Sequence, residues 1–326
     1  MKVAAFTSLT SSYLPNGRII AKSFKKFHPN MDFVLLFNDR TPSFIDWDQE
    51  PFDYVVFSEW LKTGRPWHRW AYGYSVIEHC TATKGLAAEY LMDVMGYDLV
   101  VYLDPDCQVF SRLDEIFDLI DSGDADVILT PHITDHESTP YGIWSHEIAA
   151  LKHGTFNLGF FVVANRPDGR KYLNWWAQRL VDYSHIDFVT GTFTDQKWAN
   201  LAPYIFDKVT VLTDRSYNVA TWNLTGRKLT KSKGRGWLIN DRPLRFYHFS
   251  GFGHDFAWAD SELANFARDE PDLVALWDEY KNVYNQNRLT QPAPAWHWGI
   301  YKSGAPISQR ERKALQSSTA IHPYQR

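Results

Sequence analysis

The chain has 326 residues, of which 44% are hydrophobic and 16% aromatic, enough for one large or two small domains with buried cores. Its formal net charge of −4 argues against a general attraction to nucleic acid, so an anionic ligand must meet a local cluster of cations. No apolar run approaches the roughly 20 residues that cross a bilayer, and the first residues do not resemble a secretory signal. Two cysteines, Cys80 and Cys107, make a disulfide framework implausible and favour a cytoplasmic location.

Strands and helices alternate along the chain, as expected for an α/β protein with a mainly parallel central sheet flanked by helices. Strands are expected at 2–7, 31–37, 54–57, 99–103, 127–129, 160–164, 209–212 and 244–249, and helices at 18–27, 67–80, 81–95, 112–120, 168–183 and from 194. Neither GxGxxG nor GxxxxGK[ST] is present, which excludes the dinucleotide fingerprint and the P-loop. We expect one domain over 1–290, followed by a Trp/Pro-rich and basic tail over 291–326.

The segment 98–110, DLVVYLDPDCQVF, is the most informative stretch. Its apolar run predicts a strand buried on both faces, and Pro105 ends that strand between Asp104 and Asp106. Ligands of open α/β sheets bind at the carboxyl ends of the strands. Two carboxylates at that place predict a site for Mg²⁺ or Mn²⁺ bound to a diphosphate. Two other DxD triplets, at 46–48 and 124–126, lack this context and indicate turns or solvated charge.

Several further residues allow two interpretations. Lys84 is either a surface lysine in the first turn of a helix or a cation with a specific partner. Asp195 either compensates the dipole of a helix capped by Thr194 or takes part in catalysis. The basic, glycine-rich segment 226–236 is either a solvated loop or a mobile lid over phosphates.

The loop after the strand at 127–129 carries His132 and His136. Their i, i+4 spacing could serve zinc on a helix, but the HExxH glutamate and a nearby third ligand are missing. Contact with an acceptor substrate is the favoured role of this loop. Glycines leave room for a sugar or a diphosphate at two places, Gly159 in a predicted strand and Gly251 after another.

Four motifs in this order, VVYLDPD, FNLGFFVV, DQKW and FYHFSG, resemble the motif set of glycosyltransferases with the GT-A fold, a Rossmann-like nucleotide-sugar-binding fold. The closest resemblance is to the retaining family 8, which includes glycogenin and bacterial lipopolysaccharide galactosyl- and glucosyltransferases. It implies metal-dependent transfer of a hexose from a nucleotide sugar, by preference a UDP-sugar, to a glycan, lipid-linked or other hydroxyl acceptor. It also implies a role in bacterial cell-surface polysaccharide synthesis.

The resemblance assigns roles to particular residues. Asp104 and Asp106 would bind Mn²⁺ or Mg²⁺ on the diphosphate, with His248 as the third ligand. Asp195 and Gln196 would stand at the reacting carbon. Contacts with the nucleotide or the donor sugar are implied for Thr7, Tyr13, Lys84 and Asn157.

The chain departs from the family after His248, where Gly and Lys-Pro-Trp usually follow and the lysine grips the diphosphate. Here the sequence continues Phe-Ser-Gly-Phe-Gly-His-Asp, so Arg245, His254 or the basic segment would have to replace that lysine. The basic tail could contact the inner face of a membrane peripherally.

Other functions remain open at this stage. A sugar nucleotidyltransferase also places acidic metal ligands on an α/β sheet, although it usually has a glycine-rich phosphate loop. A non-catalytic carbohydrate-binding protein could use the many aromatic residues for stacking. If the enzyme inverts configuration, it needs a carboxylate base, for which Asp135 and Glu137 are the first candidates.

Overall fold

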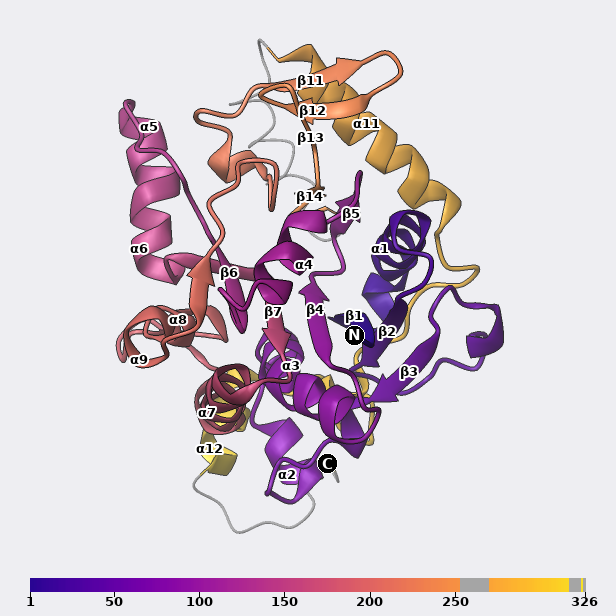
Figure 1. Ribbon diagram of the computed structural model, residues 1–326. Helices are drawn as coiled ribbons and strands as arrows, with labels where there is room; N and C mark the ends of the chain where they lie inside the picture. Colours follow the sequence, from indigo (N-terminus) through magenta and orange to yellow (C-terminus); the bar gives the residue numbers. More distant parts are fainter. Residues whose placement is uncertain (253–269, 317–323, 325–326) are drawn as a thin grey trace.

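A seven-stranded sheet forms the centre of the molecule in a computed structural model that describes residues 1–252, 270–316 and 324 (Figure 1). Its strands are β1 (Val3–Leu9), β2 (Asp32–Phe37), β3 (Tyr54–Phe57), β4 (Leu99–Leu103), β6 (Val127–Pro131), β7 (Phe156–Ala164) and β10 (Val209–Val211). Their order is β10-β6-β7-β4-β1-β2-β3, and every neighbouring pair is parallel except those that β7 makes with β4 and β6. The predicted α/β class with a mainly parallel sheet is confirmed.

Short strands form smaller sheets beside the central one. They are β5 (Cys107–Val109) with β14 (Phe246–His248), β8 (Ile186–Asp187) with β9 (Thr192–Phe193), and β11 (Leu229–Ser232) with β12 (Gly236–Ile239) and β13 (Arg242–Pro243). All three small sheets are antiparallel.

Some helices cover the two faces of the central sheet, and others lie beside it. They are α1 (Leu14–Phe27), α2 (Trp67–Tyr72), α3 (Val76–Asp93), α4 (Asp114–Asp121), α5 (Pro140–Gly142), the π-helical η4 (Ile143–Ile148), α6 (Ala149–His153), α7 (Pro167–Tyr183), α8 (Gln196–Ala199), α9 (Ala202–Ile205), α11 (Pro271–Gln286) and α12 (Gln309–Gln316). Helices α3 and α7 pack on one face, and α1 and α4 on the other. Helix α11 packs on the β11–β13 sheet and on α1.

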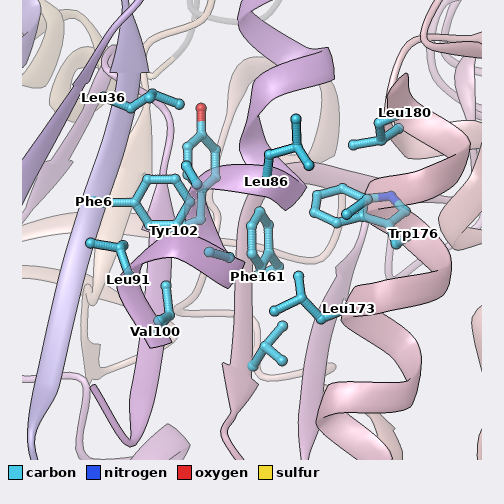
Figure 2. Close-up of a cluster of buried hydrophobic side chains, with 14 of the residues drawn as sticks. Phe6, Leu36, Leu86, Leu91, Val100, Tyr102, Phe161, Leu173, Trp176 and Leu180 are labelled. Atoms are coloured by element: carbon cyan, nitrogen blue, oxygen red, sulfur yellow. The ribbon is translucent and has the colours of Figure 1, made fainter. Parts of the chain in front are cut away.

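The core between the sheet and helices α3 and α7 is rich in aromatic rings (Figure 2). Tyr102 of β4 stacks on Phe161 of β7 with ring centroids 5.0 Å apart, and Trp176 of α7 meets Phe161 edge to face. All residues of β4 are buried, because a strand covered by helices on both faces must be apolar throughout. The apolar run of the sequence ends at Asp104 because the chain leaves the part of the sheet that the helices cover at that residue.

Helix α3 differs from the prediction. The sequence suggested one helix to residue 80 and another from Thr81, but the structure has a break before Ser75 and a continuous helix from Val76. Ser75 caps α3 in a reciprocal capping box with Glu78, whose backbone N–H lies 3.5 Å from the serine oxygen. Lys84 therefore lies in the middle of the helix, and the dipole argument for its first turn was wrong.

The basic segment 226–236 is not a loose loop. Much of it forms the β11–β12 hairpin, and Lys231 pairs with Glu279 of α11. The Arg227 side chain is buried and donates to the carbonyls of Arg215 and Asn223. The expected loose loop is wrong, because antiparallel pairing orders the segment. Its closure over phosphates stays a prediction.

The described part of the tail packs on the domain. The indole of Trp296 donates to the carbonyl of Asn38 at 2.8 Å, and the backbone N–H of His297 donates to Asp39 at 2.9 Å. Arg312 is buried and donates to the backbone carbonyls of Tyr72, the last residue of α2, and of Tyr74. Among the described residues, no helix combines the length and the apolar character needed to cross a membrane.

Glu78 couples helix α3 to the hairpin before Asp195, since its carboxylate accepts the backbone N–H of Ile186 at 2.8 Å and that of Ser75 at 2.8 Å. Burial alone would raise the pKa of Glu78, but the hydrogen bonds, together with the imidazole of His185, lower it from 4.5 to about 2. Because the pKa of Glu78 is lower in the folded than in the unfolded protein, the ionised carboxylate stabilises the fold at a pH above about 4.5. This stabilisation is lost as the pH falls from about 4.5 to about 2.

We expect Glu78→Gln to lower the free energy of unfolding at pH 7 by about 1 to 2 kcal/mol, as other cap replacements do. The difference from the wild type should shrink as the pH falls below about 4.5. Chemical denaturation across this pH range measures it. Glu59→Gln, at an exposed position, is the control and should match the wild type throughout. A Glu78→Gln deficit that does not change with pH would contradict the assigned role.

Candidate active site

A cavity of about 490 Å³ opens where the parallel strands end. It is lined by the carboxyl ends of β1 and β4, the start of β7, helix α3, the segment before α8 and the residues after β14. Because β7 is antiparallel to β4, its first residues lie beside the last residues of β4. This topology brings most of the predicted residues together. Those that line the cavity are Tyr13, Lys84, Asp104, Asp106, Asn157, Gly159, Asp195, Gln196 and His248.

Asp104, Asp106 and His248 form a cluster of possible metal ligands on one side of the cavity. The Nε2 atom of His248 lies 3.1 Å from Asp106 Oδ1 and 3.8 Å from Asp104 Oδ2. Burial alone would lower the pKa of His248, but the carboxylates of Asp106 and Asp104 raise it. Among the described residues, the side-chain ligand atoms that lie within 4.8 Å of one another belong to Asp106, Cys107 and His248, and Asp104 is not part of that group.

The strand pair β5–β14 fixes this cluster. His248 is opposite Cys107 in the antiparallel register, and the backbone N–H of Phe249 donates to the carbonyl of Asp106 at 2.8 Å. Cys107 also lies close enough to join Asp106 and His248 as a metal ligand. Burial and the charge of Asp106 raise the pKa of its thiol well above the usual value. A sulfur ligand is also softer than the oxygen ligands that suit Mg²⁺ and Mn²⁺. The expected ligand set of Asp104, Asp106 and His248 stays a prediction.

Lys84 is a buried cation on the other side of the cavity, with 3% of its surface exposed. Its ammonium lies 2.9 Å from Asp195 Oδ2 and 3.3 Å from Asp104 Oδ1, and it donates to the carbonyl of Leu158 at 3.0 Å. Burial alone would lower the pKa of Lys84, but the two carboxylates raise it above its usual value. The interpretation as an ordinary surface lysine is thus wrong.

Asp195 is held in an unusual local conformation. Its preceding residue, Thr194, has a left-handed backbone with φ of 44°, and the Thr194 hydroxyl donates to Asp195 Oδ1 at 3.1 Å. Helix α8 begins at Gln196 with Asp195 as N-cap, and the Asp195 side chain makes no capping bond. Thr194 is therefore not the cap that the sequence predicted. Dipole compensation by itself does not explain why Asp195 is buried against Lys84.

Asn157 and Gly159 line the floor of the cavity. The Asn157 carbonyl oxygen accepts from the backbone N–H of Gly159 and from the Asn218 amide, both at 3.0 Å. The backbone N–H of Asp104 donates to the carbonyl of Gly159 at 2.8 Å. A methyl group at Gly159 would lie 2.6 Å from a ring carbon of His248 and 2.9 Å from Asp104. This position therefore has no room for a side chain.

Other predicted residues lie elsewhere. Thr7 is fully buried in β1 and does not line the cavity, and Gly251 follows the lining residue Ser250 with φ of 80°. Arg245 is held by Glu115 and by the carbonyl of Arg112, so it does not replace the missing lysine at the cavity. His254 lies outside the described residues.

Three residues that sequence reasoning overlooked complete the site. The Tyr102 hydroxyl donates to Asp104 at 2.5 Å, and the Lys84 ammonium lies 4.2 Å from the Tyr102 ring centre. Asn218, with φ of 47°, orients Asn157. Trp222 packs edge to face against His248 with centroids 5.3 Å apart. Only Tyr102 carried a sequence signal, because residues i and i+2 of a strand share a face and Tyr102 is two residues before Asp104.

A second cavity, of about 500 Å³, adjoins the first. The two share the lining residues Asn157, Phe193, Gln196 and Ser250. His132 lines the second cavity and accepts from the amide of Asn157 at 3.2 Å, and burial lowers its pKa to about 4. Among the described residues, the ligand group that could hold a metal contains neither His132 nor His136.

No protein-family model matches the chain. It is similar to two uncharacterized proteins of Bacillus subtilis strain 168. YfnD is 30% identical over 123 residues, which are 37% of this chain and 38% of YfnD. YfnF is 30% identical over 99 residues, which are 30% of this chain and 33% of YfnF. The chain thus spans about a third of the length of these two relatives.

The chain is also similar to solved structures of glycosyltransferases. The galactosyltransferase LgtC, in complex with donor and acceptor sugar analogues, is 17% identical, with 90% of this chain and 98% of LgtC covered and a TM-score of 0.47. Mouse xyloside xylosyltransferase 1 is 13% identical, with 77% and 98% covered and a TM-score of 0.44. A glycosyltransferase involved in glycosylation of the major capsid of PBCV-1 is 10% identical, with 80% and 98% covered and a TM-score of 0.41.

The close approach at Gly159 gives a prediction. Gly159→Ala should lower the free energy of unfolding by about 1 to 3 kcal/mol, because the new methyl group forces His248 and Asp104 away from the strand. In a His248→Ala background, which removes the nearest obstacle, the cost of Gly159→Ala should be smaller. Chemical denaturation of the four proteins of this cycle tests the claim, and strictly additive costs would contradict it.

Proposed function

We propose that the chain is a metal-dependent glycosyltransferase that moves a hexose from a nucleotide diphosphate sugar, by preference a UDP-sugar, to a hydroxyl of a glycan or lipid-linked acceptor. One observation carries this proposal. The Asp104, Asp106 and His248 cluster and the carboxylate of Asp195 face the same cavity, and that cavity continues past Gln196 into a second one. Such a pair of joined cavities suits a donor and an acceptor.

The residues of the cluster fit a divalent cation. Asp104 and Asp106 offer hard oxygen ligands and His248 offers an imidazole nitrogen, a set that suits Mn²⁺ better than Mg²⁺. When bound, the cation would supply Lewis-acid stabilisation of the negative charge that grows on the departing diphosphate.

The other residues act by position and charge. Lys84 fixes the positions of the Asp104 and Asp195 carboxylates, since its ammonium lies within 3.3 Å of both. The hydroxyl of Tyr102 holds Asp104 Oδ1, which leaves Oδ2 directed toward His248. Tyr13 lines the cavity near the β1 end, where we place the nucleoside.

Retention of configuration is part of the proposal. An inverting enzyme needs a carboxylate base on the acceptor hydroxyl, but the described residues that line the second cavity include no carboxylate. Asp135 is paired with Arg215, and Glu137 accepts from His146 at 2.7 Å. Both candidate bases are thus paired elsewhere and do not line the second cavity. Gln196, which lines both cavities, can contact the acceptor and the donor sugar on one face.

The test is binding of UDP measured by calorimetry with and without Mn²⁺, followed by a screen of UDP-sugars for hydrolysis and transfer. We expect UDP binding to require Mn²⁺. The double substitution Asp104→Asn/Asp106→Asn should weaken Mn²⁺-dependent UDP binding by more than about tenfold, because replacing a residue that only hydrogen-bonds to a metal ligand already costs about that much. NMR of the first-formed product should show the anomeric configuration of the donor.

A matched control uses the other DxD triplet. Asp46→Asn/Asp48→Asn makes the same chemical change at exposed residues and should leave UDP binding unchanged. UDP binding that persists in EDTA would refute the proposal. Consumption of a nucleoside triphosphate with a sugar phosphate would indicate a nucleotidyltransferase, and sugar binding without any nucleotide binding would indicate a carbohydrate-binding protein.

A further inference from the structure

The segment α5–η4–α6 has an unusual distribution of side chains. It runs helically from Pro140 to His153 at the side of the molecule, beside β6 and the region of α8 and α9 (Figure 1). It buries Gly142, Ala150 and the polar His146, and exposes large apolar residues. Trp144 is 71% exposed, Ile148 39% and Leu151 69%. This is the reverse of the pattern by which a surface helix covers a core.

The three exposed residues form one stripe along the helix, which we call the apolar stripe (Trp144, Ile148 and Leu151). Their spacing of four and three residues puts them on the same face. Beside the stripe, the ammonium of Lys152, the residue after Leu151, lies 4.4 Å from the centre of the Phe188 ring in the turn of the β8–β9 hairpin. The next residue, Val189, is 97% exposed.

The apolar stripe is continuous with the second cavity. Trp144 and Ile148 belong both to the stripe and to the lining of that cavity, whereas Leu151 lies outside both cavities. The cavity lining also holds polar side chains, among them His132, Asn157 and Gln196. A surface that passes from such polar groups to exposed apolar residues suits one ligand with a polar head and an apolar tail. A free sugar would gain no binding free energy from this surface, because its hydroxyl groups form no favourable contact with the apolar side chain of Leu151.

We propose that the acceptor is amphipathic, with its sugar head in the second cavity and an apolar chain along the apolar stripe. This inference rests on the proposed glycosyltransferase function and specifies the class of acceptor. Lys152, exposed beside the stripe, is placed to pair with an anionic group at the junction of head and chain.

The test compares octyl β-glucoside with methyl β-glucoside, below the concentration at which the octyl compound forms micelles. By calorimetry, the wild type should bind the octyl compound at least about tenfold more tightly, the factor expected when two methylene groups are buried. Trp144→Ser/Leu151→Ser should reduce this preference to less than about threefold. Trp60→Ser, which removes another exposed indole at 53% exposure, should leave the preference unchanged.

Each alternative has its own outcome. An octyl preference that the Trp144→Ser/Leu151→Ser variant retains, or that Trp60→Ser also abolishes, would overturn the inference. Dimerisation in light scattering that the Trp144→Ser/Leu151→Ser variant loses would also overturn it. The inference fails as well if the wild type shows no octyl preference but sediments with phosphatidylglycerol vesicles in a way that this variant does not. Mn²⁺-dependent UDP binding is measured in parallel with Leu151→Ser, which should match the wild type. If UDP binding is absent while the octyl preference holds, the proposed function fails and the amphipathic ligand of the stripe stands.

Discussion

The buried ammonium of Lys84 is the interaction on which the geometry of the site depends. It joins three parts of the chain, because it lies on α3, pairs with Asp104 at the end of β4, and pairs with Asp195 before α8. A buried cation is tolerable only with such partners, and removing one partner of a buried pair typically costs about 3 to 5 kcal/mol. The same charge that stabilises the fold therefore sets two carboxylates at fixed positions around the cavity.

The topology of the sheet supplies the second constraint. The antiparallel strand β7 begins where β4 ends, so Gly159 meets Asp104 at a backbone hydrogen bond of 2.8 Å. The β5–β14 pair then brings His248 across from a distant part of the chain. Gly159 makes this approach possible, since any side chain there would occupy the space of the His248 ring. Cavity, ligand cluster and ion pair are thus consequences of one arrangement of strands.

The sequence predicted those parts of the site that a local pattern determines. The apolar run of β4 and its break at Pro105 located Asp104 and Asp106, because burial on both faces leaves a clear signature. The start of α3 was misplaced, since the capping box of Ser75 and Glu78 is weaker in sequence than the apolar spacing around it. The burial of Lys84 and the packing of the basic segment on α11 depend on partners remote in sequence, which local patterns do not reveal.

The central claim is that Asp104, Asp106 and His248 bind one divalent cation together with the donor diphosphate. Pulsed electron paramagnetic resonance of the protein with Mn²⁺ and UDP tests it directly, because it detects nuclei bound to the metal. The account predicts coupling to one imidazole nitrogen and to phosphorus in the wild type, with the nitrogen signal lost and the phosphorus signal kept in His248→Ala. Mn²⁺ bound with UDP but without any nitrogen coupling in the wild type would contradict it.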